Sequence, residues 1–210
     1  MTIHEPATFA TDLLLAGLAA LFAFRLRQPS LSGPGFSPSR CWWKYALGLL
    51  AISSVLGGTY HGFAREQFPQ YARIWWLITL FSIHLVSAAL GVSLLHALLP
   101  ARRQKPWRLL IFAKLLFFAG FAVLHPRFFV PIIDYGSTLL AWFVAAVALR
   151  PAWSSWMTTA ILLSGTAAAI QQLKLGPSAF FNHNDLYHVI QAVALFAFYQ
   201  AARRLPARSA

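Results

Sequence analysis

Seven long apolar segments, separated by short polar stretches, account for most of this chain of 210 residues. Each segment is close to or longer than the ~20 residues with which an α-helix crosses the hydrocarbon core of a bilayer. The pattern therefore predicts an all-α polytopic membrane protein, a seven-transmembrane helix bundle that forms a single integral membrane domain over residues 1–210. The predicted spans cover about residues 8–26, 43–62, 72–99, 107–125, 128–149, 152–174 and 184–203.

The boundary between the fourth and fifth predicted spans is the shortest, because only the sequence HPRF lies at the junction. Pro126 and Pro131 favour a break here, since proline interrupts the hydrogen-bond pattern of a helix interior. One continuous, kinked helix is the alternative. The third span is long enough to tilt or to extend beyond the bilayer.

The composition supports a membrane protein, because 59% of the residues are hydrophobic and only 10% are charged, against ~25% charged in a typical soluble domain. The formal net charge of +12 raises the question of nucleic-acid binding. The basic residues cluster in short loops, however, which is typical of a membrane protein facing anionic lipid. We therefore expect membrane lipids as partners, and no nucleic acid. No pattern in the sequence indicates an oligomeric state.

The loop charges also predict an orientation. Twelve Lys and Arg residues flank the first, third and fifth connections and the C-terminal tail, four lie on the opposite side, and Lys114 inside the fourth span completes the seventeen. By the positive-inside rule, the N-terminus lies outside and the C-terminus in the cytoplasm. The short loops favour a compact protein of the bacterial inner membrane. The twelve residues are Arg25, Arg27, Arg40, Lys44, Arg102, Arg103, Lys105, Arg108, Arg150, Arg203, Arg204 and Arg208.

The acidic residues and most of the histidines lie toward the outer ends of the predicted spans. Polar groups at membrane depth are costly and tend to be functional. The outer end is therefore where we expect the functional site. The acidic residues are Glu5, Asp12, Glu66, Asp134 and Asp185, and the histidines at this end are His4, His61, His125, His183 and His188.

Three of these histidines are the candidate metal ligands. His61, in the sequence GGTYHGF, ends the second span, and His183 and His188, in FNHNDLYHV, open the seventh. The topology places all three at one depth, and three imidazoles with an open position are the ligand set of a catalytic zinc site. His183 and His188 are ~140° apart on a regular helix. Both therefore reach one ion only if His183 lies at or before the helix cap, and otherwise Asp185 replaces it.

Each of these sequences also fits a purely structural role. Gly58 and Gly62 form a G-x-x-x-G pattern, which allows a neighbouring helix to approach closely. Asn182, Asn184 and Asp185 are candidate N-cap residues for the last helix, so part of the polarity there is ordinary capping.

Asp185, Asp134 and Ser54 are the candidate catalytic side chains. Asp185 shares a helix face with His188, and either moves protons or fixes the tautomer of a liganding histidine. Asp134, near the start of the fifth span, is either a proton carrier or the partner of a nearby arginine or of the helix N-terminus. Ser54 roughly shares a face with His61, although most such hydroxyls bond to their own helix.

With one histidine closing the second span and two opening the seventh, the chain resembles the CREST superfamily of seven-helix membrane hydrolases. This superfamily includes the alkaline ceramidases and the adiponectin and progestin receptors. The topology is similar over the whole chain, whereas the sequence motifs are similar only at GGTYHGF and HNDLYH. It implies a zinc-bearing membrane amidase fold in which His61, His183 and His188 bind Zn²⁺.

The chain departs from the superfamily pattern at three positions. Gly57 stands four residues before the second-span histidine, where the pattern has serine, and the last-span histidines are five rather than four residues apart. The pattern also has an aspartate early in the third span, which this chain lacks. Asp134, Glu66 or Asp185 would then have to supply the proton-transfer group.

Three functions follow from these residues. The first is a zinc-dependent intramembrane hydrolase that acts on a lipid-like amide or ester. The second, favoured by the departures, is a non-catalytic receptor or metal sensor that uses the same histidines. The third is a haem-binding redox protein, which needs two histidines on facing helices, such as His84 with His61 or His188.

Overall fold

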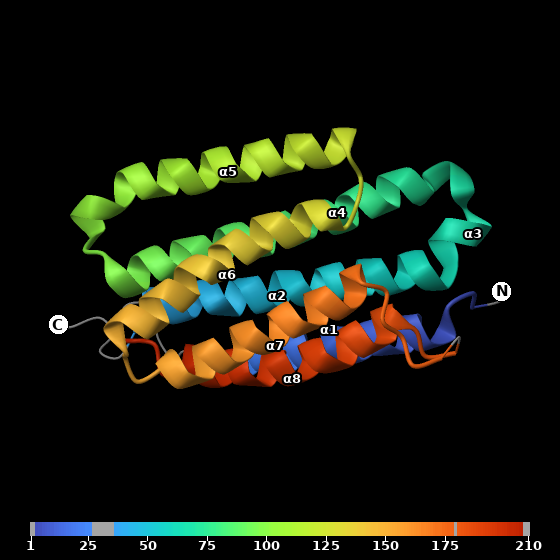
Figure 1. Ribbon diagram of the computed structural model, residues 1–210. Coiled ribbons are helices and arrows are strands. Elements are labelled where there is room, and N and C mark those ends of the chain that lie inside the picture. The colour runs from blue at the N-terminus through green and yellow to red at the C-terminus, as the bar shows by residue number, and fades with distance from the viewer. Residues whose placement is uncertain (1–2, 27–35, 179, 208–210) are drawn as a thin grey trace.

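The computed structural model describes residues 3–26, 36–178 and 180–207, and every regular element within these ranges is a helix (Figure 1). The long helices are α1 (Pro6–Arg25), α2 (Pro38–Thr59), α4 (Pro69–Leu98), α5 (Gln104–Leu124), α6 (Phe129–Leu149), α7 (Ser154–Gln172) and α8 (His183–Arg203). The short ones are the π-helix η1 (Tyr60–Ala64), α3 (Arg65–Gln67) and the 3₁₀ helix η2 (Ala101–Arg103). The prediction of an all-α fold is confirmed, and each long helix matches one of the seven predicted segments.

Five of the described helical segments are long and apolar enough to cross a membrane. They are α1, the stretch Pro38–Gln67 that contains α2, then α4, the stretch Ala101–Leu124 that contains α5, and α6. Neither α7 nor α8 is among these five. The reason is visible in α8, which opens with the polar sequence HND and carries Gln191 near its middle.

The predicted break between the fourth and fifth segments is confirmed. Helix α5 ends at Leu124, and α6 begins at Phe129 after a reversal of the chain. Trp76 on α4 holds this turn, because its indole Nε1 donates a 2.8 Å hydrogen bond to the carbonyl oxygen of Pro126. The single kinked helix that the sequence left open is therefore not formed.

Six of the long helices form a ring, and the seventh lies outside it. Around the ring, α1 packs against α2, α2 against α4, α4 against α6, α6 against α7, α7 against α8, and α8 against α1. Among the described elements, α5 packs mainly against α4, α6 and the η2 turn, and Figure 1 shows it along the edge of the bundle. The segment that follows Leu26 in sequence, residues 27–35, lies outside the described residues.

A hydrophobic core fills one half of the ring. Trp43 on α2 meets the ring of Trp142 on α6 at 5.8 Å and the ring of Phe198 on α8 at 5.4 Å. Trp142 is fully buried and donates a hydrogen bond from Nε1 to the carbonyl oxygen of Leu90. Large aromatic side chains thus occupy the interior where α2 begins and α8 ends. The opposite half, where α1 begins and α2 ends, is called the N-terminal end of the bundle below.

Glycine allows α1 and α2 to approach closely at the N-terminal end. A Cβ atom at Gly58 would lie 2.9 Å from the Cβ of Asp12, and one at Gly62 would lie 3.1 Å from the ring of Phe9. No side chain larger than hydrogen fits at Gly58 without a shift of the helices. The expectation that G-x-x-x-G brings a neighbouring helix close is therefore confirmed, and the neighbour is α1.

A Gly58→Ala variant is expected to be destabilised by about 1–3 kcal/mol, because overpacking a tight contact forces the helices apart. Gly57→Ala is the matched control, since a Cβ there would lie 3.6 Å from the nearest atom of Asp12, an ordinary contact. Alanine also has the better helix propensity, by about 1 kcal/mol, so the control should be neutral or stabilised. Unfolding in mixed micelles measures the stability of both variants. Equal losses of stability in Gly58→Ala and Gly57→Ala would contradict a close approach of α1 at Gly58.

Candidate functional site

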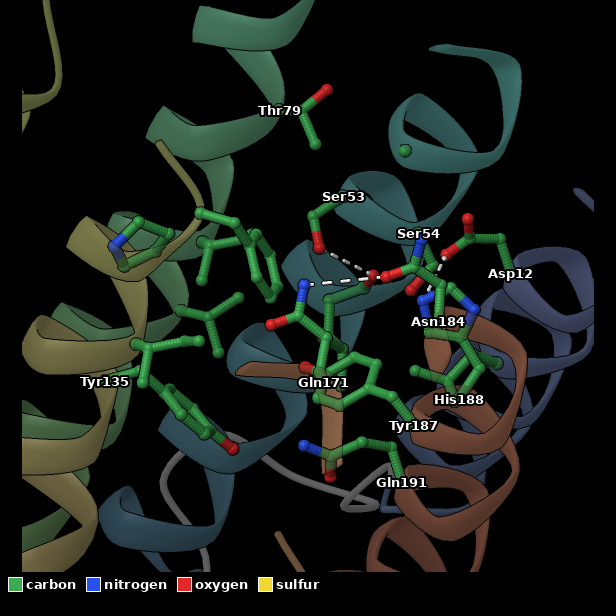
Figure 2. Close-up of a pocket in the computed structure, with 18 of the residues that line it drawn as sticks. Asp12, Ser53, Ser54, Thr79, Tyr135, Gln171, Asn184, Tyr187, His188 and Gln191 are labelled. Atoms are coloured by element: carbon green, nitrogen blue, oxygen red, sulfur yellow. Dashed lines mark hydrogen bonds and ion pairs between the residues drawn. The ribbon is translucent and has the colours of Figure 1, made fainter. Parts of the chain in front are cut away.

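A cavity of about 420 Å³ lies inside the ring at its N-terminal end. Helices α1, α2, α4, α6 and α8 supply most of its wall, and η1, the turn before α6 and one residue of α7 complete it. Figure 2 shows that polar side chains from α1, α2 and α8 gather on one side, while α4 and α6 form the other. The polar lining residues from α1, α2, η1 and α8 are Asp12, Ser53, Ser54, His61, His183, Asn184, His188 and Gln191, and Thr79 of α4 and Gln171 of α7 add to them.

His61 reaches the cavity from a π-helical turn. Helix α2 passes without a break into η1, and the wider turn carries His61 toward the start of α1. There its Nδ1 lies 3.1 Å from Oε2 of Glu5, while Arg65 contacts the other carboxylate oxygen at 3.3 Å. The contact with the His61 ring and the charge of Arg65 hold the pKa of Glu5 below its usual value. π-Turns inside α-helices are frequent at functional sites.

His188 is held between two side chains of α1. Its Nδ1 lies 3.0 Å from Oγ1 of Thr11, and its Nε2 lies 3.3 Å from Oδ1 of Asp12. The hydroxyl proton of Thr11 is directed to the carbonyl oxygens of Ala7 and Thr8, so the hydroxyl oxygen accepts from an Nδ1–H. Nε2 of the neutral ring is then an acceptor that faces a carboxylate. A proton or a cation is required between them.

Asp12 is the functional candidate that the sequence reasoning missed. It lines the cavity, is 5% exposed, and its Oδ2 is buried without a hydrogen-bond partner among the described residues. A buried polar atom without a partner costs free energy and marks a place where a ligand or proton is missing. The sequence did contain a signal for it, because Asp12 is a carboxylate inside the first apolar segment, and charged groups at membrane depth tend to be functional.

His183 is the first residue of α8, where the sequence required it to be if it were to share an ion with His188. Asn182 caps the helix by accepting from the backbone N–H of Asn184 at 2.7 Å. Asp185 completes a capping box, because it accepts from the backbone N–H of Asn182 at 2.7 Å. The expectation that ordinary capping accounts for part of this sequence is thus met by Asn182 and Asp185.

Asp185 does not line the cavity. Its side chain is fully buried and accepts a 2.7 Å hydrogen bond from Oγ1 of Thr8, so both carboxylate oxygens are engaged within the protein. Ser54, the third catalytic candidate, does line the cavity, one turn before Gly57. Ser53 beside it also lines the cavity but donates to the carbonyl oxygen of Leu50 at 3.1 Å.

Asp134 belongs to a different cluster, between α4, α5 and α6. Its Oδ2 lies 2.6 Å from Nδ1 of His84, and its Oδ1 lies 2.6 Å from Nζ of Lys114. Lys114 also donates to Oγ1 of Thr138 at 2.7 Å and to Oγ of Ser87 at 3.1 Å. The structure therefore places Asp134 with His84 on the outer side of the ring wall, and not with His61 and His188. Of the histidine pairs proposed for haem, His61 and His188 line the main cavity, whereas His84 lines a small separate pocket beside Lys114.

The donor types that line the main cavity suit a zinc ion, but their positions do not gather around one point. Three imidazoles line the cavity. Nε2 of His188 and Oδ1 of Asp12 are both acceptors and lie 3.3 Å apart, so a cation or a proton is needed between them. Within the part of the chain that the structure describes, however, no three His, Cys, Asp or Glu side chains are grouped closely enough to hold an ion. Zinc therefore stays a prediction.

Comparison with known proteins identifies one family. A model described as Family of unknown function (DUF6962) matches residues 7–207. No curated protein and no solved structure matches the chain. All the residues that line the cavity fall within the matched range, so the cavity is built entirely from the region that defines the family.

Proposed function

Because the chain belongs to the DUF6962 family, whose description names no activity, we propose a function from the cavity itself: a zinc-dependent hydrolase that cleaves a lipid amide or ester within the membrane. One observation carries this proposal. His61, His183 and His188, from two segments far apart in sequence, line a single cavity together with the buried carboxylate of Asp12. A pocket with an apolar wall and a few convergent polar groups is the usual form of a small-molecule site.

To hold zinc, His61, His183 and His188 would have to draw closer together than they lie in the structure, and the bound ion would then polarise the scissile carbonyl and activate a water molecule. The remaining work falls to the protein. Asp12 takes up the proton that the attacking water loses and delivers it to the leaving amine or alcohol, as a general acid–base group does. Thr11 fixes the ring of His188 by accepting from Nδ1–H, so that Nε2 faces the cavity and Asp12.

We also propose that all seven long helices cross the membrane, with the N-terminus outside and the C-terminus in the cytoplasm of a bacterial cell. Helices α7 and α8 pack lengthwise between α6 and α1, which are themselves apolar enough to span (Figure 1). The basic residues of the first, third and fifth connections favour this orientation. The cavity would then lie in the outer half of the bilayer, open to substrates dissolved in the lipid.

The metal content of the purified protein tests the proposal. We expect about one zinc ion per chain in the wild type, and loss of the ion in a His188→Ala variant, because removing one of three ligands weakens a zinc site severely. His125→Ala is the matched control, since His125 is exposed and lies on the turn between α5 and α6. Zinc that is absent from the wild type, or equal in the wild type and the His188 variant, would remove the basis of the proposal.

A second candidate, a non-catalytic receptor or metal sensor, is favoured by one observation. The carboxylate of Asp12 faces Nε2 of His188, the ring nitrogen left to bind a metal, at 3.3 Å. A carboxylate in that place would fill the coordination position that a hydrolytic zinc site keeps open for water, and a sensor needs no such position. Assays of hydrolysis across ceramides, acyl-homoserine lactones and phospholipids distinguish the two candidates, because bound metal without turnover favours the sensor.

A further inference from the structure

We propose that the cavity takes a single acyl chain with a small uncharged head that contains an amide, and that it discriminates against phosphate headgroups and two-chain lipids. This inference rests on the proposed function in so far as it takes the cavity as the ligand site. It goes further by naming the ligand from the charge, the hydrogen-bond donors and the shape of the wall.

The charge of the wall argues against a phosphate. Among the described residues that line the cavity there is no lysine and no arginine, whereas Asp12 is a carboxylate with a free oxygen. Phosphate groups in proteins are held by Arg, Lys or a helix N-terminus, and an unpaired buried anion is costly. A lipid whose head carries a phosphate would therefore find no lysine or arginine on the described wall to pair with it.

The donors on the wall match a carbonyl oxygen. Oε1 of Gln191 accepts a 2.9 Å hydrogen bond from Ser164, and Oδ1 of Asn184 accepts from Gln171 at 3.5 Å. The amide NH₂ group of Asn184 is therefore the part of that side chain left to meet a ligand, whereas the Gln191 side chain also contacts Tyr187. Asn184 and Gln191 are seven apart on α8 and share one face, about two turns from each other. Figure 2 shows both beside Tyr187 on the wall that α8 contributes.

The shape of the cavity favours one chain. Its lining along α8 runs from His183 to Phe198, which corresponds to about 22 Å along the helix axis. The volume of about 420 Å³ is in the lower part of the range for drug-sized ligands, so it holds on the order of 15–20 non-hydrogen atoms. A dodecanoyl chain with a small amide head has this size, and a ceramide has about twice as many atoms.

The polar and apolar parts of the wall also set the direction of the chain. The histidines and Asp12 lie at the N-terminal end, whereas Leu50, Leu195 and Phe198 close the deep end. The head and its carbonyl would lie beside His61 and His188, and the chain would point toward the core of the ring. This direction places the amide bond at the groups that the proposed hydrolase would use.

Trp76 provides a binding readout that does not depend on turnover, because it lines the cavity. The protein in nanodiscs is titrated with a mid-chain dibrominated N-dodecanoylethanolamide, and the quenching lost in Trp76→Phe reports the cavity. Unlabelled N-dodecanoylethanolamide, dodecanoyl-lysophosphatidylcholine and ceramide then compete. We expect the neutral single-chain amide to displace the probe at a concentration at least tenfold lower than either competitor.

Two variants at one position test the shape. Leu50→Phe should shift the preferred acyl chain to a shorter length, and Leu50→Ala to a longer one. The shift should be about two to four carbons each way, if each methylene group added to or removed from the wall changes the chain by about one carbon. No quenching specific to Trp76, equal or better displacement by the phosphate-headed or two-chain lipid, or an unchanged chain preference in both variants would overturn the inference. Binding of the amide without cleavage would contradict the proposed hydrolase but support the proposed ligand class. Cleavage with a preference for ceramide would support the hydrolase and contradict the ligand class.

Discussion

Replacing Asp12 by asparagine is expected to slow the hydrolysis of a single-chain lipid amide by about 10²- to 10⁴-fold, the usual contribution of a general acid–base group. Asparagine keeps the size of the side chain and can place an N–H opposite Nε2 of His188, but it cannot take up and release a proton. The assay is the release of fatty acid by purified protein in nanodiscs. Thermal unfolding of the same sample shows whether the variant remains folded.

Asp185→Asn is the informative comparison, because both residues are buried carboxylates at the N-terminal end of the bundle. Asp185 caps α8 and binds Thr8. Its replacement should therefore cost stability, about 1–2 kcal/mol for a lost cap, with a rate per folded molecule within about threefold of the wild type. A loss of rate at Asp185 as large as that at Asp12 would return the catalytic role to the residue that the sequence favoured.

Replacing Asp134 by alanine is expected to lower the free energy of unfolding by about 3–5 kcal/mol, the effect of breaking a buried ion pair by removing one partner. The carboxylate is 2% exposed and serves two groups at once, Nδ1 of His84 and Nζ of Lys114. Its loss leaves both without their carboxylate partner in the wall between α4, α5 and α6. Unfolding in mixed micelles measures the effect.

The double variant Asp134→Ala with Lys114→Met separates charge from packing. Removing both members of a buried pair is often nearly neutral, so the double variant should recover part of the stability lost by Asp134→Ala. Ser137→Ala is the surface control on the same helix, because this exposed hydroxyl only donates to the backbone carbonyl of Asp134. If the single and double variants were equally unstable, the charge of Lys114 left without its carboxylate would not be the cause of the loss.

The helices were predictable because their signal is local. Each long apolar run needs only its own length to indicate a helix, and Pro126 and Pro131 mark the one ambiguous break. The contact at Gly58 was also predictable, since closely spaced glycines on one face indicate close helix packing. These features depend on residues within one or two turns of each other.

The pairing of side chains across the ring was not predictable in the same way. Whether Asp12 or Asp185 contacts His188 depends on which face of α1 is turned toward α8. Asp12 and His188 are 176 positions apart in the sequence, so no local pattern specifies their contact. Depth alone suggested that Asp134 would join the histidines, but depth does not specify the face of the helix. The structure turns Asp134 outward to His84 and Lys114, while its neighbour Tyr135 lines the cavity.

The π-turn at Tyr60–Ala64 has a consequence for the tolerance of this segment to insertions and deletions. A π-turn contains about one residue more than an α-helical turn, so the helix after it is rotated by about 100° relative to an uninterrupted helix. Deleting a single residue here would allow a regular α-helix to run on through Gln67. Either His61 or Arg65 would then swing away from Glu5, so we expect a one-residue deletion in this turn to be as damaging as replacement of the histidine itself.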